Sequence, residues 1–114
     1  MRVPEAVKNA LDMYVEYISS LDGILRIYLF GSYAYGAPYE GSDIDLMVII
    51  EDKSDALKTN LKIQKGLCDR SVPLDILVNN VSKFEEFAES PSLQNQIKNK
   101  GALLYDKRHV PDLA

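Results

Sequence analysis

Cysteine, histidine and long apolar runs are scarce in this sequence of 114 residues. The single cysteine, Cys68, excludes a disulfide within the chain and cannot supply the several thiolates of a zinc site, so we expect it to pack in a buried helix. The only histidine, His109, has no nucleophile or metal ligand near it in the sequence, which favours an ordinary surface position. No apolar run approaches the roughly 20 residues needed to span a bilayer, so a membrane partner is not expected.

Positive charge is also in short supply. The chain has 13 lysines and arginines against 17 aspartates and glutamates, a formal net charge of −4. Direct binding to nucleic acid would need a basic surface along the phosphate backbone, and this composition argues against it. Since the N-terminus also lacks the charged and apolar regions of a signal peptide, we expect a cytoplasmic protein.

The size favours one domain over residues 1–114, ending in an irregular tail at 106–114. Apolar residues make up 46% of the chain and charged residues 26%, as in ordinary globular proteins. Strand and helix patterns alternate, which predicts an α/β (α+β) class with a small mixed sheet flanked by helices.

A Gly-Ser turn follows the first strongly apolar run. Ile24–Phe30 has the length and composition of a buried strand, and Gly31 with Ser32 ends it. A glycine lets the backbone approach a ligand closely, while free backbone N–H groups and the Ser32 hydroxyl can bind phosphate oxygens. We expect a short helical turn over Ser32–Tyr35.

Two aspartates begin the next apolar run. Ser42–Ile50 is predicted as a strand, in which Asp43 and Asp45 share one face because side chains alternate. Aspartates near a strand start can simply cap loops or stay solvated. However, like charges on one face repel, and a cation between them would explain the pair. Mg²⁺ fits, since it takes hard oxygen ligands from one or two carboxylates together with substrate phosphates.

A third aspartate is brought to the same place by topology. Leu74–Val78 is predicted as a strand that follows a crossover helix, and such a unit is parallel and right-handed. Asp75 then lies at the same sheet end as the start of Ser42–Ile50, although it could also be one polar residue on a half-exposed strand. We therefore expect one site built from residues that are distant in sequence: Gly31, Ser32, Asp43, Asp45 and Asp75.

The remaining segments are predicted as helices and one edge strand. A first amphipathic helix starts at Pro4 and ends before Gly23; its apolar stripe forms core, but the edges of Tyr14 and Tyr17 could instead serve a partner. The crossover helix is capped by Ser54, with Leu57, Leu61, Gln64, Leu67 and Cys68 on or near one face. Later features are a turn at Asn79-Asn80, a helix capped by Ser82, a break at Pro91, a helix end at Gly101 and an edge strand at Ala102–Tyr105.

Some side chains near the expected site have two interpretations. Tyr33, Tyr35 and Tyr39 could stack on a base or simply hold their loop in place. Lys62, Lys65 and Arg70 could face a triphosphate or form a solvated helix face.

The motif resembles a known family. Gly31-Ser32, ten further residues and then Asp43-x-Asp45 is similar to the GS-x10-DxD signature of the DNA polymerase β-like nucleotidyltransferases. The chain looks most like their minimal nucleotidyltransferase (MNT) branch, in which GSYARG is followed by SDIDL; Gly36 and Ser42 also match. The resemblance extends through PLDILV to GALLYD and covers almost the whole chain. Tyr35 stands where the family usually has arginine.

The resemblance implies transfer of a nucleoside monophosphate from a nucleoside triphosphate, here ATP, to a hydroxyl. Asp43 and Asp45 would hold two Mg²⁺ ions, and Asp75 would complete the ion that activates the hydroxyl. Gly31, Ser32 and Ser42 would contribute to nucleotide binding.

Stand-alone MNT proteins of this size resemble antitoxins that adenylylate a hydroxyl, commonly a tyrosine, of a HEPN ribonuclease toxin. A second interpretation is a non-catalytic module of the same fold that silences its partner by contact, which Tyr35 favours. A third, a small-molecule adenylyltransferase, is disfavoured because such enzymes generally carry an extra helical domain.

Overall fold

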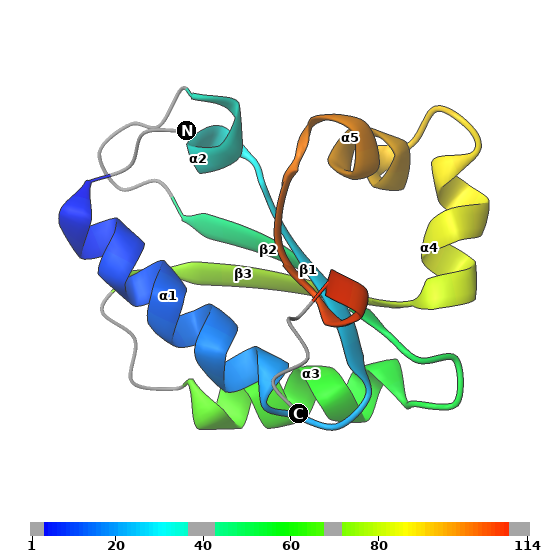
Figure 1. Ribbon diagram of the computed structural model, residues 1–114, viewed down its shortest axis with the longest axis horizontal. Coiled ribbons are helices and arrows are strands. Elements are labelled where there is room, and N and C mark those ends of the chain that lie inside the picture. The colour runs from blue at the N-terminus through cyan, green and yellow to red at the C-terminus, as the bar shows by residue number, and fades with distance from the viewer. Residues whose placement is uncertain (1–3, 37–42, 68–71, 110–114) are drawn as a thin grey trace.

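The structure, a computed structural model, describes residues 4–36, 43–67 and 72–109. Within these residues a four-stranded sheet has the order β3-β2-β1-β4 (Figure 1). Its strands are β1 (Ile24–Phe30), β2 (Ile44–Ile50), β3 (Leu74–Asn80) and β4 (Ala102–Asp106). β1 runs antiparallel to β2 and to β4, whereas β2 and β3 are parallel. The predicted mixed sheet and the parallel third strand are confirmed.

Helices cover both faces of this sheet (Figure 1). They are α1 (Glu5–Ser19), α3 (Ala56–Gly66), α4 (Val81–Ala88) and α5 (Leu93–Lys100), with a short α2 (Ser32–Tyr35) directly after β1. Successive strand residues point to opposite faces, so Ile27 packs in the core with α1 and α3, and Tyr28 packs in a second core with α4 and α5. The expected α+β class is confirmed. None of the helices described is long and apolar enough to cross a membrane.

The strand and turn around the Gly-Ser motif follow the sequence prediction closely. β1 and α2 have the predicted bounds. β2 begins at Ile44, so Asp43 lies directly before the strand rather than inside it. Ser42 lies outside the described residues.

The predicted turn at Asn79-Asn80 is wrong. Both residues belong to β3, because their backbones continue the pairing with the last two residues of β2. The Asn80 side chain also holds the neighbouring loop, donating to the carbonyl oxygens of Glu51 at 3.0 Å and Ser54 at 2.8 Å. β3 therefore passes directly into α4.

Two predicted helix caps are also wrong. Asp55, not Ser54, caps α3, and its carboxylate accepts from the backbone N–H of the third helical residue at 3.0 Å. Asn80 occupies the cap position of α4, while Ser82 lies inside that helix. Asp52, which lies outside α4, holds Ser82 in place. The backbone N–H of Ser82 donates to the Asp52 carboxylate at 2.9 Å, and the Ser82 hydroxyl donates to the same carboxylate. A carboxylate near a helix start also complements the helix dipole.

The apolar stripe of α1 forms core as expected, whereas the exposed face of α3 differs from the prediction. Tyr14 is fully buried, so its edge is not available to a partner. On α3, Leu57 and Leu61 are 70% and 58% exposed, and the core contacts are made by Ile63 and Leu67. The helix is rotated so that two of the leucines assigned to its buried face point outward.

The C-terminal segment is more regular than predicted. β4 is an edge strand as expected, but it extends to Asp106, and Lys107–His109 form a 3₁₀ turn, η1. The Asp106 carboxylate stabilises this turn by accepting from the backbone N–H of Arg108 at 3.0 Å. The irregular tail expected at 106–114 is therefore wrong for 106–109. Residues 110–114, Cys68 and the side chain of His109 lie outside the part of the chain that the structure describes.

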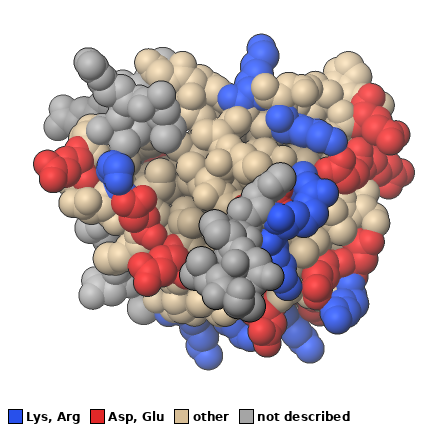
Figure 2. All heavy atoms as spheres, in the orientation of Figure 1, with Lys and Arg blue, Asp and Glu red and all other residues tan. Residues whose placement is uncertain are grey.

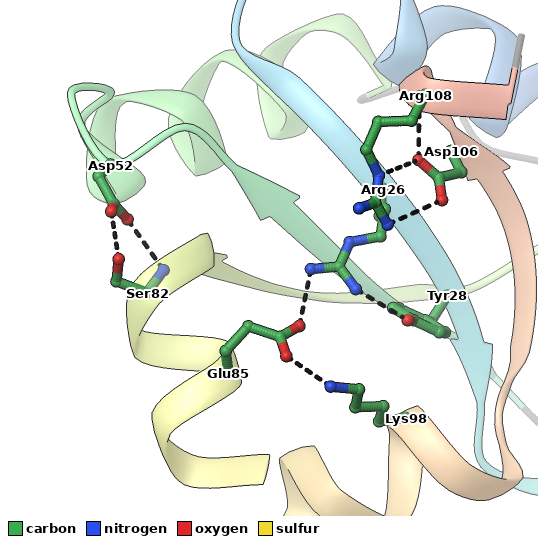
Figure 3. A network of polar contacts seen from close by, with 8 residues as sticks. All are labelled: Arg26, Tyr28, Asp52, Ser82, Glu85, Lys98, Asp106 and Arg108. Atoms are coloured by element: carbon green, nitrogen blue, oxygen red, sulfur yellow. Dashed lines mark hydrogen bonds and ion pairs between the residues drawn. The ribbon is translucent and has the colours of Figure 1, made fainter. Parts of the chain in front are cut away.

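A buried arginine joins β1 to α4 (Figure 3). Arg26 is 8% exposed and donates to Glu85 at 2.8 Å and to the Tyr28 hydroxyl at 3.1 Å. Its guanidinium also lies over the rings of Tyr28 and Phe84. Burial is the largest single effect on the pKa of Arg26 and lowers it, but the interactions with Glu85 and Tyr28 together outweigh burial, so the pKa is raised. Because Glu85 also binds Lys98, the network connects β1, α4 and α5.

We expect Arg26→Ala to lower the free energy of unfolding by about 2–3 kcal/mol, because Glu85 loses its buried partner and two rings lose their cover. Equilibrium urea unfolding measures this. Lys8→Ala is the control, since it breaks an exposed pair with Asp12 (3.0 Å) and should cost less than about 0.5 kcal/mol. Equal losses in the two variants would contradict a structural role for Arg26.

Candidate active site

The acidic residues of interest lie at one end of the sheet because of how its central strands pair. β1 ends where β2 begins, and Phe30 pairs with Asp45. Across the parallel pair, Asp45 is the direct partner of Asp75. Laterally paired residues point to the same face, so these two carboxylates are neighbours. Asp43 precedes the same strand by one residue.

The crowding of carboxylates changes the ionisation of Asp45. Its pKa is raised from 3.8 to about 6, first by burial and then by the negative charges of Asp75 and Asp43. The negative form is disfavoured because, within the part of the chain that the structure describes, no cation contributes an opposing effect on the pKa of Asp45. A hard divalent cation would relieve this repulsion, so the donor set fits Mg²⁺.

Gly31, in the turn after β1, lies directly against the Asp45 carboxylate. Its φ is +78° and its ψ is −160°, a conformation that is open almost only to glycine. A Cβ at this position would lie 2.1 Å from Oδ2 of Asp45, so the missing side chain makes room for the carboxylate. The Gly31 carbonyl then accepts from the N–H groups of Ala34 and Tyr35 as α2 begins. The turn thus presents bare backbone beside an acidic group.

The tyrosines near the turn have different roles. Tyr33 is buried in the core beside α1 and the sheet, which supports the packing interpretation for this residue. Tyr35, at 39% exposure, lies at the end of α2 and remains available to a ligand. Tyr39 lies outside the described residues.

Two of the positive groups considered for phosphate binding, Lys62 and Lys65, do not join the acidic cluster. Lys62 and Lys65 line an outward groove of α3 together with Lys58 and Leu61, which supports a solvated helix face. Arg70 lies outside the described residues. A cavity of about 410 Å³ is lined by Arg26, Asp106 and Arg108 among others, and it includes none of the acidic cluster.

Within the described ranges, no three acidic, histidine or cysteine side chains already form a metal-binding group. The carboxylates are adjacent in strand register and electrostatically coupled rather than closed around a point. Ion binding here would therefore require side-chain rotation, which costs little for an exposed aspartate such as Asp75.

One contact near the site was not foreseen from the sequence. The Tyr14 hydroxyl donates to the backbone oxygen of Val72 at 2.8 Å and accepts from its N–H at 3.2 Å. The next residue, Pro73, accepts from the N–H of Ile44 at 2.9 Å. These bonds fix the chain where it enters β3, directly before Asp75. A tyrosine on an apolar stripe was the available signal, and a buried tyrosine hydroxyl usually needs a partner.

Gly31→Ala tests the packing of the turn against Asp45. It should lower the free energy of unfolding by about 3 kcal/mol or more, because the substitution adds backbone strain and a clash with the carboxylate. Gly36→Ala is the matched control: Gly36 also has a positive φ, +80°, but a Cβ there would meet nothing within 4 Å. That variant should cost about 1 kcal/mol. Thermal and urea unfolding that ranked the two variants equally would refute the close approach.

The pH dependence of stability tests the crowding at Asp45. A carboxyl whose folded pKa is about 6 and whose ordinary value is 3.8 keeps its proton longer in the folded state. Its contribution to stability is complete below pH 3.8 and is lost as the pH rises through about 6. In metal-free buffer, Asp45→Asn should remove this fall and be more stable than wild type at neutral pH. Asp22→Asn, in the exposed turn after α1, should keep it. A wild-type profile that rises over this range would contradict the assignment.

The comparisons with known proteins agree on the fold. The chain matches the model of the family described as polymerase beta, nucleotidyltransferase, over residues 14–110. No curated protein matches it in sequence. A protein from Sulfolobus solfataricus, described as a candidate nucleotidyltransferase, has a TM-score of 0.60 at 17% identity, and the match covers 99% of this chain and 97% of that one.

Two further structures come from toxin–antitoxin complexes. One, with AMP-PNP, has a TM-score of 0.50 at 24% identity and covers 89% of this chain and 74% of that chain. The other, a mutant of the toxin–antitoxin MntA-HpeT, has a TM-score of 0.52 at 19% identity. The match covers 94% of this chain and 76% of that chain. At these identities the likeness concerns the fold.

The family model spans the Gly-Ser turn and all three aspartates, so the match includes the whole acidic end of the sheet as well as the core. The chain belongs to the polymerase β nucleotidyltransferase family.

Proposed function

We propose that this protein is an Mg²⁺-dependent antitoxin that transfers AMP from ATP to a hydroxyl, a tyrosine in particular, of a HEPN ribonuclease toxin. The observation that carries the catalytic part is the coupled carboxylate group at the sheet end, in which Asp45 has a pKa of about 6 beside Asp75 and against Gly31. Such a perturbed group in a family of nucleotidyltransferases favours a reaction centre over a structural role.

The chain's own residues have distinct tasks in this proposal. Asp43, Asp45 and Asp75 would hold two Mg²⁺ ions, which would neutralise the triphosphate and polarise its α-phosphorus. Gly31 offers phosphates a backbone without a side chain, and Ser32 adds a hydroxyl at the start of α2. Ser42 is assigned to nucleotide binding through the motif alone.

The proposed reaction is a single substitution at the α-phosphorus of ATP. The acceptor oxygen forms a bond to the α-phosphorus of ATP, the bond to the β-phosphate oxygen breaks, and pyrophosphate leaves. Asp75 would accept the proton of the attacking hydroxyl. It suits this task because it is exposed at the edge strand, whereas Asp45 is partly buried in the strand beside it.

The toxin partner is supported by the two toxin–antitoxin structures of similar fold, one of which contains AMP-PNP. The described part of the chain has no additional helical layer that could hold a small acceptor. An acceptor supplied by a partner protein suits such a compact catalytic unit. The exposed Tyr35, where the family usually has arginine, favours the second candidate, a contact inhibitor without catalysis.

The deciding experiment incubates this protein with the product of its neighbouring toxin gene, ATP and Mg²⁺. We expect the partner's mass to rise by one or more AMP units and its ribonuclease activity to stay low after this protein is removed. Asp75→Asn should abolish the mass increase, since proton transfer and ion binding are lost together. Asp22→Asn, an exposed aspartate at the other end of β1, should modify the partner like wild type.

An unchanged partner mass with full neutralisation by wild type and by Asp75→Asn would favour the contact inhibitor. Inhibition by contact would then vanish on dilution, because it follows mass action. Transfer that persists in excess chelator would overturn the role assigned to Mg²⁺.

A further inference from the structure

The outer face of α3 is basic and apolar in a chain that is acidic overall. Leu57 and Leu61 are 70% and 58% exposed, and Lys58, Lys62 and Lys65 are exposed beside them. No acidic residue occurs within α3. Lys58, Leu61, Lys62 and Lys65 line a groove of about 400 Å³ along the helix. Of the exposed large apolar side chains in the described residues, Leu57 and Leu61 are the two most exposed, and they lie one turn apart on the same helix.

The outer face of the neighbouring helix α1 has the opposite charge. Glu5, Asp12 and Glu16 are exposed there, and only Asp12 has a lysine partner within the helix, at 3.0 Å. Met13 is 56% exposed among them. In Figure 2 the acidic side chains follow the course of α1 across the face in view, while basic side chains project along the lower edge, where Figure 1 places α3.

The two helices meet near their C-terminal ends. The Tyr17 hydroxyl donates to the backbone oxygen of Lys62 at 3.4 Å, and a Cβ on Gly66 would lie 2.0 Å from that hydroxyl oxygen. Met13 lies one turn before Tyr17 on the same side of α1, and so toward α3. The acidic and basic faces are therefore neighbours on one side of the molecule, and they join where the C-terminal turns of the two helices meet. Met13 lies near this junction, while Leu57 and Leu61 are exposed on the outer face of α3.

We propose that this surface joins two copies of the chain around a twofold axis, with α1 of each copy lying on α3 of the other. A twofold contact brings the same patch together twice, and it is favourable when the patch has complementary halves. Asp12 and Glu16 of one copy would then face Lys58 and Lys62 of the other, both times. The exposed leucines and Met13 would be buried in the middle.

This arrangement explains why the charges are separated by helix rather than mixed. A solvated helix normally intersperses both signs, as α1 does in part with Lys8 and Asp12. The proposal rests on none of the chemistry assigned to the sheet end, so the two can be tested independently. The other possible occupant, an unrelated acidic partner protein, would leave the isolated chain monomeric.

Sedimentation velocity of the isolated protein, over about three decades of concentration, should show a reversible monomer–dimer equilibrium. Dimerisation should weaken on going from about 0.1 M to 1 M salt, because the pairs are partly screened. Leu61→Ser should weaken it about tenfold or more, whereas Leu103→Ser, at 47% exposure on β4, should leave it unchanged. A wild-type protein that remains monomeric throughout would overturn the proposal.

A charge exchange makes the test specific to the two helices. The double variant Lys58→Glu with Lys62→Glu, and separately Asp12→Lys with Glu16→Lys, should each be monomeric, because both halves of the patch then have the same sign. Mixing the two double variants should restore dimers with one copy of each, since every acidic face again meets a basic one. All four positions are exposed, and circular dichroism of each variant checks its fold. Folded variants that still dimerise alone, or that fail to associate when mixed, would refute the α1-on-α3 contact.

Discussion

The close approach of the Asp45 carboxylate to Gly31 is the constraint on which the acidic end of the sheet depends. The carboxylate lies where any other residue would have its Cβ, so the turn can present bare backbone only while position 31 is glycine. Asp45 is also partly buried, and Asp75 and Asp43 add negative charge, so its pKa is raised to about 6. The backbone geometry at Gly31, the partial burial and the neighbouring negative charges thus all act on the Asp45 carboxylate.

Strand pairing brings the Gly-Ser turn and the aspartates together at one end of the sheet. β2 is antiparallel to β1 and parallel to β3, so the end of β1 and the starts of β2 and β3 meet. β2 is almost wholly apolar, and Asp45 is its one ionisable residue. Arg26, four residues before the end of β1, is instead bound by Glu85 on the face of the sheet that α4 and α5 cover. Among the described residues no cation offsets the charge of Asp45, so the acidic end has an excess of negative charge that a divalent ion could neutralise.

The sequence predicted the strands, their relative directions and the gathering of the aspartates, because alternation, apolar runs and crossover topology are set by short-range chemistry. Prediction from the sequence failed where tertiary contacts compete with the local sequence pattern. Asn79 and Asn80 are good turn residues, yet pairing with β2 keeps them in β3. Leu57 and Leu61 fit a buried stripe, but the side of α3 that meets the sheet is set by Ile63 and Leu67. The core interpretation of Tyr14 is confirmed, but its hydrogen bonds to Val72, 58 positions away, could not be seen locally.

At the acidic end, the like charges that lower the stability of the metal-free protein would also strengthen the binding of a cation. Each carboxylate added beside Asp45 makes the metal-free fold less stable near neutral pH, because the native state must keep like charges together that the unfolded chain separates. The same repulsion increases the free energy gained when a cation binds the native state, since an ion that binds only the folded chain stabilises it by mass action. The cost is confined to one end of the sheet, and the buried core on both faces offsets it. Under the proposed function, a group of carboxylates that is unfavourable by itself is what a site for a positively charged ligand requires.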